Sequence, residues 1–561
     1  MQDFAKASFT NNSHLLREHV LVTLFYVLAT ALATPHYMGD TTNYAGTITD
    51  WSIRSIWEFG HLLWFPLGWL FSKITFPLTR IIYGDVSRTN ALLALIILNW
   101  IAGLVCVLAI QMLAQRATKR GWIVWLVVAG FTFTNGFLNY TQTGCSYVPG
   151  LAFLLVSLCL STRPQANMKS LVLSGAALAL ALCLWLPYVL AAPAAIAAPL
   201  LLLPTRGSPI SALRARWKQA AVVAISGGLA TLGIYFLAAL AMGVHDLTGL
   251  RAWMAEVSHG AMSKGLTRMI FGFARSFINM GDDGILFKRF MLHDPYSPVT
   301  VADLIRLSIG KLVLFYAFLA AIVIGLISKR EWYVLTFLAI SAIPVLAFAI
   351  GWQGGDMERY LAFYPALFVA LAYALNSTRA KSIVRICTLM FIVIASLVNA
   401  AYMSLPAAQA RESGQYNRVA GLALLWQKND ALFVSHLQEG LYGFNNDYPF
   451  HAFNRNNNFR VLEITSPNVQ WSRQWQSAFA TNARRVWDDG GRVWISKRVL
   501  KEQPRPEWNW VEGADETLSW TQLNKFFQQF EYGQSVGGEN GFVLLPNSAR
   551  NREALPQNPL N

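Results

Sequence analysis

Charged residues are scarce in this chain. Only 13% of its 561 residues are charged, whereas 54% are hydrophobic, and ordinary soluble domains carry roughly 25% charged residues. Apolar stretches of about 20 residues recur between Leu21 and Tyr402, and each is long enough to cross roughly 30 Å of hydrocarbon as a helix. A single soluble core is therefore excluded, and the sequence predicts a polytopic membrane protein.

Cysteines and soluble-enzyme motifs are also few. There are five cysteines; one, Cys145, falls in a predicted outer loop, and the others lie in apolar stretches: Cys106, Cys159, Cys183 and Cys387. This distribution implies neither a disulfide framework nor a zinc site. Gly-rich phosphate loops, HExxH and GxSxG do not occur in a meaningful context. Soluble nucleotide-dependent enzymes are therefore disfavoured.

The positive charges follow a topological pattern. The net charge is +15, and Lys and Arg gather in every second connection between apolar stretches, at residues 116–120, 163–169, 206–218, 329–330 and 379–385. This is the positive-inside pattern, so no nucleic-acid partner is expected. It predicts a cytoplasmic N-terminus and about eleven transmembrane helices: residues 20–34, 91–113, 122–140, 147–161, 170–187, 190–203, 220–242, 309–327, 332–350, 361–375 and 386–402.

The same topology places three long segments outside: residues 36–90, 243–307 and the chain after residue 403. The first two combine aromatic residues with scattered charges at helical spacing, which suits amphipathic helices against membrane lipids. Strand-like runs at 431–435, 459–464, 492–495 and 541–545 alternate with polar helical segments. We therefore expect a mostly α transmembrane module over residues 1–406. A small periplasmic α/β domain should follow over 407–561, with a disordered tail after Pro546.

Asp40 is the first candidate for chemistry. It follows the first apolar stretch within HYMGDTTNY, at the outer membrane surface. A carboxylate there can take the proton of an acceptor hydroxyl while that oxygen attacks a sugar phosphate. Tyr44 follows four residues later and shares a helix face with Asp40. The alternatives are a helix-capping aspartate and a tyrosine of the aromatic belt.

Phosphate-binding candidates lie on the same side. Arg359 and Tyr360 open an apolar stretch at its outer end, where positive charge is otherwise avoided, and a guanidinium binds phosphate in bidentate fashion. His61, in GHLLWFP, and Lys264 are further candidates for donor contacts. The alternatives are an arginine snorkelling to headgroups, a structural histidine and a membrane-surface lysine.

A divalent metal is possible but not indicated. Acidic residues gather in the second outer segment beside a histidine, but their spacing matches no known ligand signature: Asp282, Asp283, His293 and Asp294. No cofactor is therefore expected.

Three short motifs, GDTTNY, GHLLWFPLGWLF and RYLAFYP, carry a family resemblance. With the layout of the chain, they resemble the GT-C superfamily of integral membrane glycosyltransferases, in particular bacterial relatives of protein O-mannosyltransferases and aminoarabinose transferases. The resemblance implies Asp40 as the catalytic carboxylate, Arg359 and Tyr360 near the lipid phosphate, and inversion at the anomeric carbon. Several relatives have a second acid, but Thr41 follows Asp40 and residues 135–150 contain no acid. The sequence thus predicts a single-base mechanism.

The resulting expectation is an inverting hexosyl- or pentosyltransferase of the bacterial inner membrane that works on the periplasmic side. Its donor would be a polyprenyl-phosphate sugar, and its acceptor a glycan, lipid or protein. A transporter or flippase for lipid-linked sugars is an alternative, although it should place ionisable groups near the midplane of its spans. A polysaccharide polymerase or ligase and a non-catalytic glycan-binding protein are also compatible with the sequence.

Overall fold

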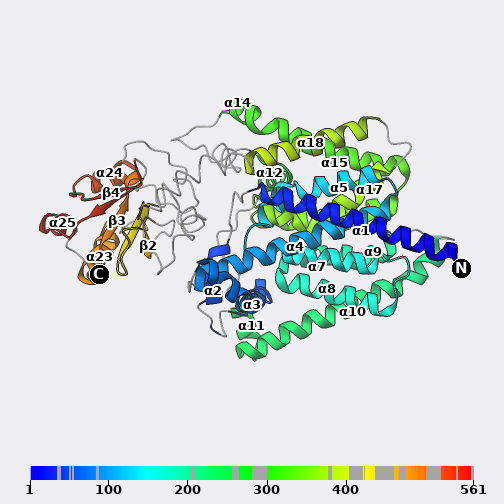
Figure 1. Ribbon diagram of the computed structural model, residues 1–561, viewed down its shortest axis with the longest axis horizontal. Helices are drawn as coiled ribbons and strands as arrows, with labels where there is room; N and C mark the ends of the chain where they lie inside the picture. The colour runs from blue at the N-terminus through cyan, green and yellow to red at the C-terminus, as the bar shows by residue number, and fades with distance from the viewer. Residues whose placement is uncertain are drawn as a thin grey trace. The chain divides into compact units, whose positions relative to one another are not determined.

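The computed structural model describes most of the chain (Figure 1). The described residues are 2–33, 40–49, 52, 56–83, 87–203, 209–255, 265–280, 300–376, 382–403, 421–422, 424–435, 460–465, 475–500, 520–538 and 541–556. The chain divides into two compact units. We call them the helical unit (Met1–Phe76, Ala91–Gly284 and Leu307–Leu405) and the sheet unit (Pro77–Asn90, Ile285–Arg306 and Pro406–Asn561).

Helices make up the described structure up to residue 403. In chain order they are α1 (Gln2–Ala31), α2 (Thr41–Thr49), η1 (Phe59–His61), α3 (Trp64–Tyr83), α4 (Ser87–Ala117), α5 (Gly121–Thr132), α6 (Asn135–Tyr140), α7 (Tyr147–Ser161), α8 (Met168–Leu184), η2 (Leu186–Ala191), α9 (Ala192–Leu201), α10 (Pro209–Met242), α11 (Leu247–Ala255), α12 (Leu266–Phe277), α14 (Val301–Leu304), η3 (Ile305–Ile309), α15 (Gly310–Lys329), α16 (Trp332–Gly351), η4 (Met357–Phe363), α17 (Tyr364–Leu375) and α18 (Ser382–Met403).

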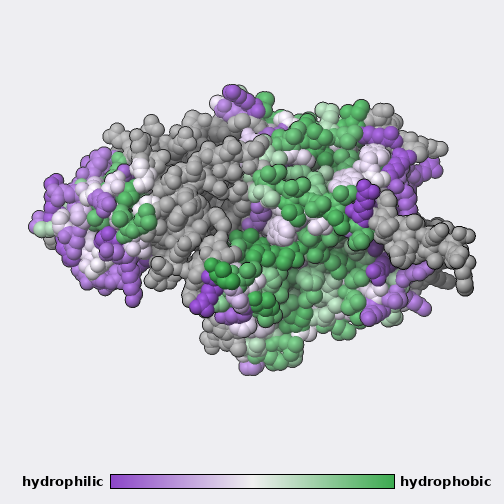
Figure 2. All heavy atoms as spheres, viewed as in Figure 1, coloured by the Kyte–Doolittle hydropathy of each residue, from purple (hydrophilic) through white to green (hydrophobic). Residues whose placement is uncertain are grey.

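The described helices include five that are long and apolar enough to cross a membrane. They span Asn90–Ala117, Arg216–Met242, Gly310–Lys329, Trp332–Gly351 and Val384–Met403. Large apolar side chains along α10 are exposed, among them Leu229, Leu232 and Phe236. Figure 2 shows hydrophobic residues gathered over the visible face of the helical unit. An apolar exterior of this kind is what a lipid environment requires.

The expected count of about eleven spans is not confirmed. The stretch 122–140 is divided into α5 and α6 by a break at Phe133 and Thr134, and the stretch 190–203 contains the end of η2 followed by α9, which has 10 residues. At 1.5 Å per residue, α9 is only about 15 Å long. Hydropathy therefore locates the apolar stretches but not the points at which their helices break.

Small residues allow the helices to pack closely. A Cβ added at Gly175 of α8 would lie 2.0 Å from the hydroxyl of Ser226 and 2.7 Å from the backbone nitrogen of Gly227, both in α10. The backbones of α8 and α10 thus approach each other at a point where only glycine fits. Such contacts are typical of helices that pack without a hydrophobic driving force in lipid.

An aromatic cluster supports the start of η4. Phe273 and Phe277 of α12 pack against Phe315 of α15 at ring distances of 5.1 and 5.0 Å. Tyr360 of η4 packs on Phe273 at 5.1 Å, and Tyr364 of α17 packs on Phe277 at 4.5 Å. Aromatic pairs at these distances stabilise the contact beyond their buried area. The cluster fixes η4 against α12, and η4 carries Arg359.

The sheet unit confirms the expected small C-terminal sheet domain. Its strands are β1 (Ala431–Ser435), β2 (Arg460–Thr465), β3 (Val493–Ser496), β4 (Ser535–Val536) and β5 (Phe542–Leu545), in the order β2-β1-β3-β5-β4. β1 runs parallel to β2 and β3, whereas β5 runs antiparallel to β3 and β4. Helices α23 (Trp475–Asp488) and α24 (Trp520–Phe527) supply Phe479 and Phe527 to the same core cluster as Phe433 and Ile495.

The expected disorder after Pro546 is wrong for the helix α25 (Ala549–Ala554). Ser548 caps this helix by accepting a hydrogen bond from the backbone of Asn551. The buried Asn551 side chain in turn donates to the carbonyl groups of Glu531 and Pro546. These local side-chain hydrogen bonds, which composition does not reveal, order the segment.

Candidate active site

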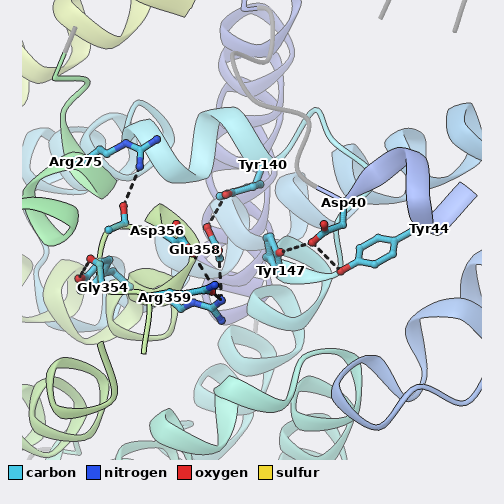
Figure 3. Close-up of polar contacts among 12 residues, drawn as sticks. Asp40, Tyr44, Tyr140, Tyr147, Arg275, Gly354, Asp356, Glu358 and Arg359 are labelled. Atoms are coloured by element: carbon cyan, nitrogen blue, oxygen red, sulfur yellow. Dashed lines mark hydrogen bonds and ion pairs between the residues drawn. The ribbon is translucent and has the colours of Figure 1, made fainter. Parts of the chain in front are cut away.

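Asp40 lies directly before α2, and its backbone carbonyl accepts the hydrogen bond of the Tyr44 amide at 2.9 Å. Because this bond closes the first turn of the helix, the two side chains are brought to one face. The Tyr44 hydroxyl donates to Asp40 Oδ2 at 3.4 Å, and the Tyr147 hydroxyl, from the start of α7, donates to the same oxygen at 3.5 Å (Figure 3). Two phenols thus hold one carboxylate oxygen.

The surroundings of Asp40 favour its protonated form. Burial raises the pKa of the Asp40 carboxyl group, and the negative charge of Glu358 raises it further. The hydrogen bonds from the two tyrosines and the positive charge of Arg359 act in the opposite direction but do not outweigh them. A carboxylate with a raised pKa holds a proton more strongly, which is the property that a general base needs.

Tyr44 connects Asp40 to a histidine. Its hydroxyl lies 3.1 Å from His61 Nε2, and His61 Nδ1 lies 2.7 Å from the Ser146 hydroxyl. The Tyr44 ring packs edge-to-face on Phe65 at 5.2 Å, which fixes its orientation. Burial, and then the charge of Asp40, raise the pKa of Tyr44, so it remains a neutral phenol that can donate.

Arg359 lies in η4 among three oxygen-bearing side chains. Its Nη2 donates to Gln353 Oε1 at 2.7 Å and lies 3.9 Å from both Glu358 Oε1 and Asp356 Oδ2. Burial opposes its charge, but these two carboxylates outweigh that effect and raise the pKa of Arg359. Its Nε is buried and has no hydrogen-bond partner among the described residues. Since buried donors are normally paired, this guanidinium has capacity for an anion.

Glu358 is held independently of Arg359. The Tyr140 hydroxyl, at the end of α6, donates to Glu358 Oε2 at 2.7 Å, and the residue is only 8% exposed. Figure 3 shows Tyr140, Glu358 and Tyr147 between Arg359 and Asp40. Tyr140 and Tyr147 meet edge-to-face at 4.9 Å. The side chains that bind Glu358 and Asp40 are therefore in contact through two tyrosine rings, and Glu358 lies beside the arginine.

The turn before η4 has a backbone that few residues tolerate. Gln353 has φ of 43°, in the left-handed region, which costs a non-glycine residue free energy. A Cβ at Gly272 of α12 would lie 1.9 Å from the Gly354 carbonyl oxygen. Arg275 Nη1 donates to the Gly355 carbonyl at 2.9 Å. The turn is thus pressed against α12, and this contact positions Gln353 beneath Arg359.

Asp356 differs from the buried acids of the site. Its side chain is 43% exposed. Partial burial, and then the charge of Glu358, raise its pKa, whereas Arg359 and Arg275 lower it. It lies at the rim of the polar group, beside Arg359.

The predicted residues fall into two sets. Asp40, Tyr44 and His61 are brought together, and Arg359 is close enough to act on the charge of Asp40. Tyr360 is not in this group: its hydroxyl donates to the carbonyls of Met269, at 3.0 Å, and Gly354, at 2.5 Å. It therefore holds the turn against α12. Lys264 lies outside the described residues.

Four members of the site were not predicted from the sequence. They come from loops and helix ends far from Asp40 in the chain: Tyr140, Ser146, Tyr147 and Glu358. The one sequence feature that could have indicated these residues is Glu358, an acid at the outer end of an apolar stretch. From the sequence alone, however, Glu358 is most simply explained as a charge that balances Arg359. The tyrosines resemble ordinary aromatic-belt residues in sequence.

Within the described part of the chain, no group of three or more His, Cys, Asp or Glu side chains is arranged to hold a metal ion. The acidic residues of the second outer segment and His293 lie outside that part. The expectation that no cofactor takes part therefore stays a prediction.

Comparison with known proteins identifies a fold. No protein-family model and no curated protein matches the sequence. Among solved structures, ArnT from Cupriavidus metallidurans bound to undecaprenyl phosphate matches with a TM-score of 0.51 and 10% identity, over 96% of this chain and 98% of that chain. The apo form of the same protein matches with a TM-score of 0.51 and 11% identity, over 97% of this chain and 99% of that chain. The Archaeoglobus fulgidus oligosaccharyltransferase matches with a TM-score of 0.44 and 14% identity, over 97% of this chain and 75% of that chain. The likeness to ArnT confirms the GT-C fold that the motifs predicted.

Proposed function

We propose that this protein of GT-C fold is an inverting glycosyltransferase that moves a sugar from a polyprenyl-phosphate donor to an extracytoplasmic acceptor. The observation that carries the proposal is a partly buried carboxylate, Asp40, held by two phenols and close enough to the guanidinium of Arg359 for the two charges to interact. The likeness in fold to ArnT, which binds undecaprenyl phosphate, supports a lipid-linked donor.

Asp40 acts as the general base. Its carboxylate takes the proton of the acceptor hydroxyl while the acceptor oxygen attacks the anomeric carbon of the donor. The bond from that carbon to the phosphate oxygen breaks, and the polyprenyl phosphate leaves with the bonding electrons. Attack from the face opposite the leaving group inverts the configuration. Because phosphate is already a good leaving group, no second acid has to protonate it.

Arg359 stabilises the leaving phosphate. Its unpaired Nε and its weak 3.9 Å contacts with Glu358 and Asp356 leave donors for the phosphate oxygens. A partly desolvated guanidinium is worth more there than in water, because charge builds up on the phosphate as the bond breaks. Gln353 keeps the guanidinium in place through the 2.7 Å hydrogen bond to Nη2.

The remaining assignments follow from the same proposal. The positive connections support a multi-pass protein of the bacterial inner membrane, with a cytoplasmic N-terminus and a periplasmic C-terminal domain. The donor would carry a hexose or a pentose, and the acceptor would be a glycan, lipid or protein. Lys264 would add positive charge for the donor phosphate. Tyr360 would act indirectly, by holding the turn that carries Gln353.

Purified protein in liposomes tests the proposal. Radiolabelled polyprenyl-phosphate sugars and candidate acceptors are supplied, and the wild type is compared with Asp40→Asn. We expect the wild type to form labelled acceptor and the variant to form almost none. Labelled sugar lipid that changes leaflet without transfer would instead indicate a flippase, and growth of a polymer that is unaffected by Asp40→Asn would indicate a polymerase or ligase.

A further inference from the structure

We infer that Tyr44 and His61 form a relay that carries away the proton which Asp40 takes from the acceptor, and that Ser146 orients the imidazole of His61. This inference rests on the proposed function. It assigns His61 a role after the transfer step, in place of a contact with the donor.

Three contacts make the chain continuous. Asp40 Oδ2 lies 3.4 Å from the Tyr44 hydroxyl, which lies 3.1 Å from His61 Nε2, and His61 Nδ1 lies 2.7 Å from the Ser146 hydroxyl. The rings of Tyr44 and His61 are 5.3 Å apart. The second and third distances are those of hydrogen bonds, whereas the first is long for an O–H···O bond, so the proton passes when the Asp40 and Tyr44 side chains approach each other.

The chain joins two partly exposed groups through a buried one. Asp40 and His61 are both partly exposed, whereas Tyr44 between them is only 6% exposed and Ser146 is fully buried. A proton on Asp40 can thus reach, through one buried phenol, a second partly exposed group, which is an imidazole. Histidine is the side chain whose ordinary pKa lets it accept and release protons near neutral pH.

Protons balance along the relay. Protonated Asp40 gives its proton to the Tyr44 oxygen while Tyr44 gives its own hydroxyl proton to His61 Nε2. Asp40 returns to the carboxylate, Tyr44 stays neutral, and His61 becomes an imidazolium that then loses a proton to water. Nε2 can accept only if neutral His61 carries its proton on Nδ1. In that tautomer Nδ1 donates to the Ser146 hydroxyl, which lies 2.7 Å away.

The relay acts between turnovers, so a substitution in it should lower the steady-state rate more than the rate of the first turnover. In His61→Gln, we expect the ratio of the steady-state rate to the single-turnover rate to fall by about tenfold or more, within the range of general acid–base effects. Added imidazole, which can accept the proton directly, should restore that ratio. An exposed histidine of the helical unit, His245, provides the matched control: His245→Gln should leave the ratio at the wild-type value and show no imidazole effect.

Three outcomes would overturn the relay. They are an unchanged ratio in His61→Gln, an equal fall of both rates that imidazole does not restore, and an imidazole effect of the same size in the wild type. An unchanged ratio would mean that the proton leaves Asp40 directly, for example with the phosphate product. If His61→Gln fails to fold, Tyr44→Phe, which keeps the ring and loses only the hydroxyl, must show the same fall in the ratio.

The single-turnover assay of the wild type shows whether the proposed function or only the relay has failed. If the wild type transfers no sugar in a single turnover, the proposed function fails. If it transfers sugar and the His61 variant behaves as in any of the three outcomes above, only the relay fails.

Discussion

At the scale of single residues, Glu358 acts on Asp40, the proposed base, in addition to the effect of burial. Its negative charge raises the pKa of Asp40, and Asp40 accepts a proton only as a carboxylate, so transfer falls as the pH drops through that pKa. Glu358→Gln removes the charge but keeps an oxygen for the Tyr140 hydroxyl. We expect the acidic limb of the pH profile of kcat/KM to move to lower pH in this variant. A limb that stays in place would mean that Glu358 does not act on Asp40.

The buried Asp40 also reduces stability. Its pKa in the folded protein lies above its unfolded value, so the cost of burying the charge is fully present at pH values above the folded pKa. Lowering the pH through that pKa protonates the group and removes the cost. We therefore expect Asp40→Asn to unfold at a higher Tm than the wild type at alkaline pH, with a difference that shrinks as the pH falls. Thermal unfolding of both proteins in detergent over a pH series checks this, and a Tm gain that does not depend on pH would contradict it.

The contact of Asp40 with Tyr44 was predictable because it is local: four positions along a helix bring two side chains to one face. The approach of Glu358 and Tyr147 to Asp40 was not predictable. It depends on how η4 and α7 pack, and the residue pattern of a single segment does not encode such packing. The contacts of Tyr360 were not predictable for the same reason. Its neighbour Arg359 faces the polar group, while its own hydroxyl bonds to backbone carbonyls of α12 and the turn.

At the scale of elements, the approach of α12 to the turn before η4 is the critical contact. A Cβ at Gly272 would meet the Gly354 carbonyl at 1.9 Å, so Gly272→Ala must displace the turn that carries Gln353. Overpacking of this kind costs about 1–3 kcal/mol. We expect a higher KM for the lipid-linked donor, because Arg359 loses its support. The matched change Gly233→Ala in α10, where a Cβ meets nothing within 4 Å, should leave KM unchanged.

In the sheet unit, Asp430 joins the starts of β1 and β3. Its carboxylate accepts bonds from the Arg492 guanidinium at 2.7 Å, the Arg492 amide at 2.9 Å and Trp494 Nε1 at 3.1 Å, and the side chain is fully buried. Asp430→Ala leaves the Arg492 amide and Trp494 Nε1 without this acceptor, and the guanidinium keeps the Leu425 carbonyl, so we expect the free energy of unfolding to fall by about 1–3 kcal/mol. Hydrogen exchange of β1 and β3 in the full chain measures it.

An exposed ion pair provides the control for that measurement. Asp488 pairs with Arg552 at 2.8 Å, and the two side chains are 61% and 41% exposed. Such surface pairs contribute about 1 kcal/mol or less. Exchange in Asp488→Ala should therefore remain close to the wild type. Equal effects of the two substitutions would show that the Asp430 contacts do not hold the strands together.

The elements themselves were predictable to different degrees. The strand runs were located because alternating apolar residues over a few positions are a local signal. The break between α5 and α6 was not, because composition on both sides of it is equally apolar. A break was expected between residues 187 and 190, but it lies earlier, at Trp185 between α8 and η2. Packing against neighbouring helices, and not hydropathy, decides where these helices end.

At the scale of the whole molecule, the membrane class and the GT-C fold were predictable, although only 10% of residues match ArnT. Helix packing in a membrane requires apolar length, small residues at contacts and polar residues at the ends of spans, and many sequences meet those requirements. Under the proposed function, a few side chains around Asp40 would select the sugar and the acceptor. No general pattern encodes those.

The central claim is that Asp40 performs the transfer as its base. A single-turnover assay with enzyme in excess over a radiolabelled polyprenyl-phosphate sugar measures that step directly, and binding of unlabelled polyprenyl phosphate serves as the check on folding. The account predicts that Asp40→Asn binds the lipid as the wild type does while its transfer rate falls by about 10²-fold or more. Transfer by Asp40→Asn at the wild-type rate would contradict it.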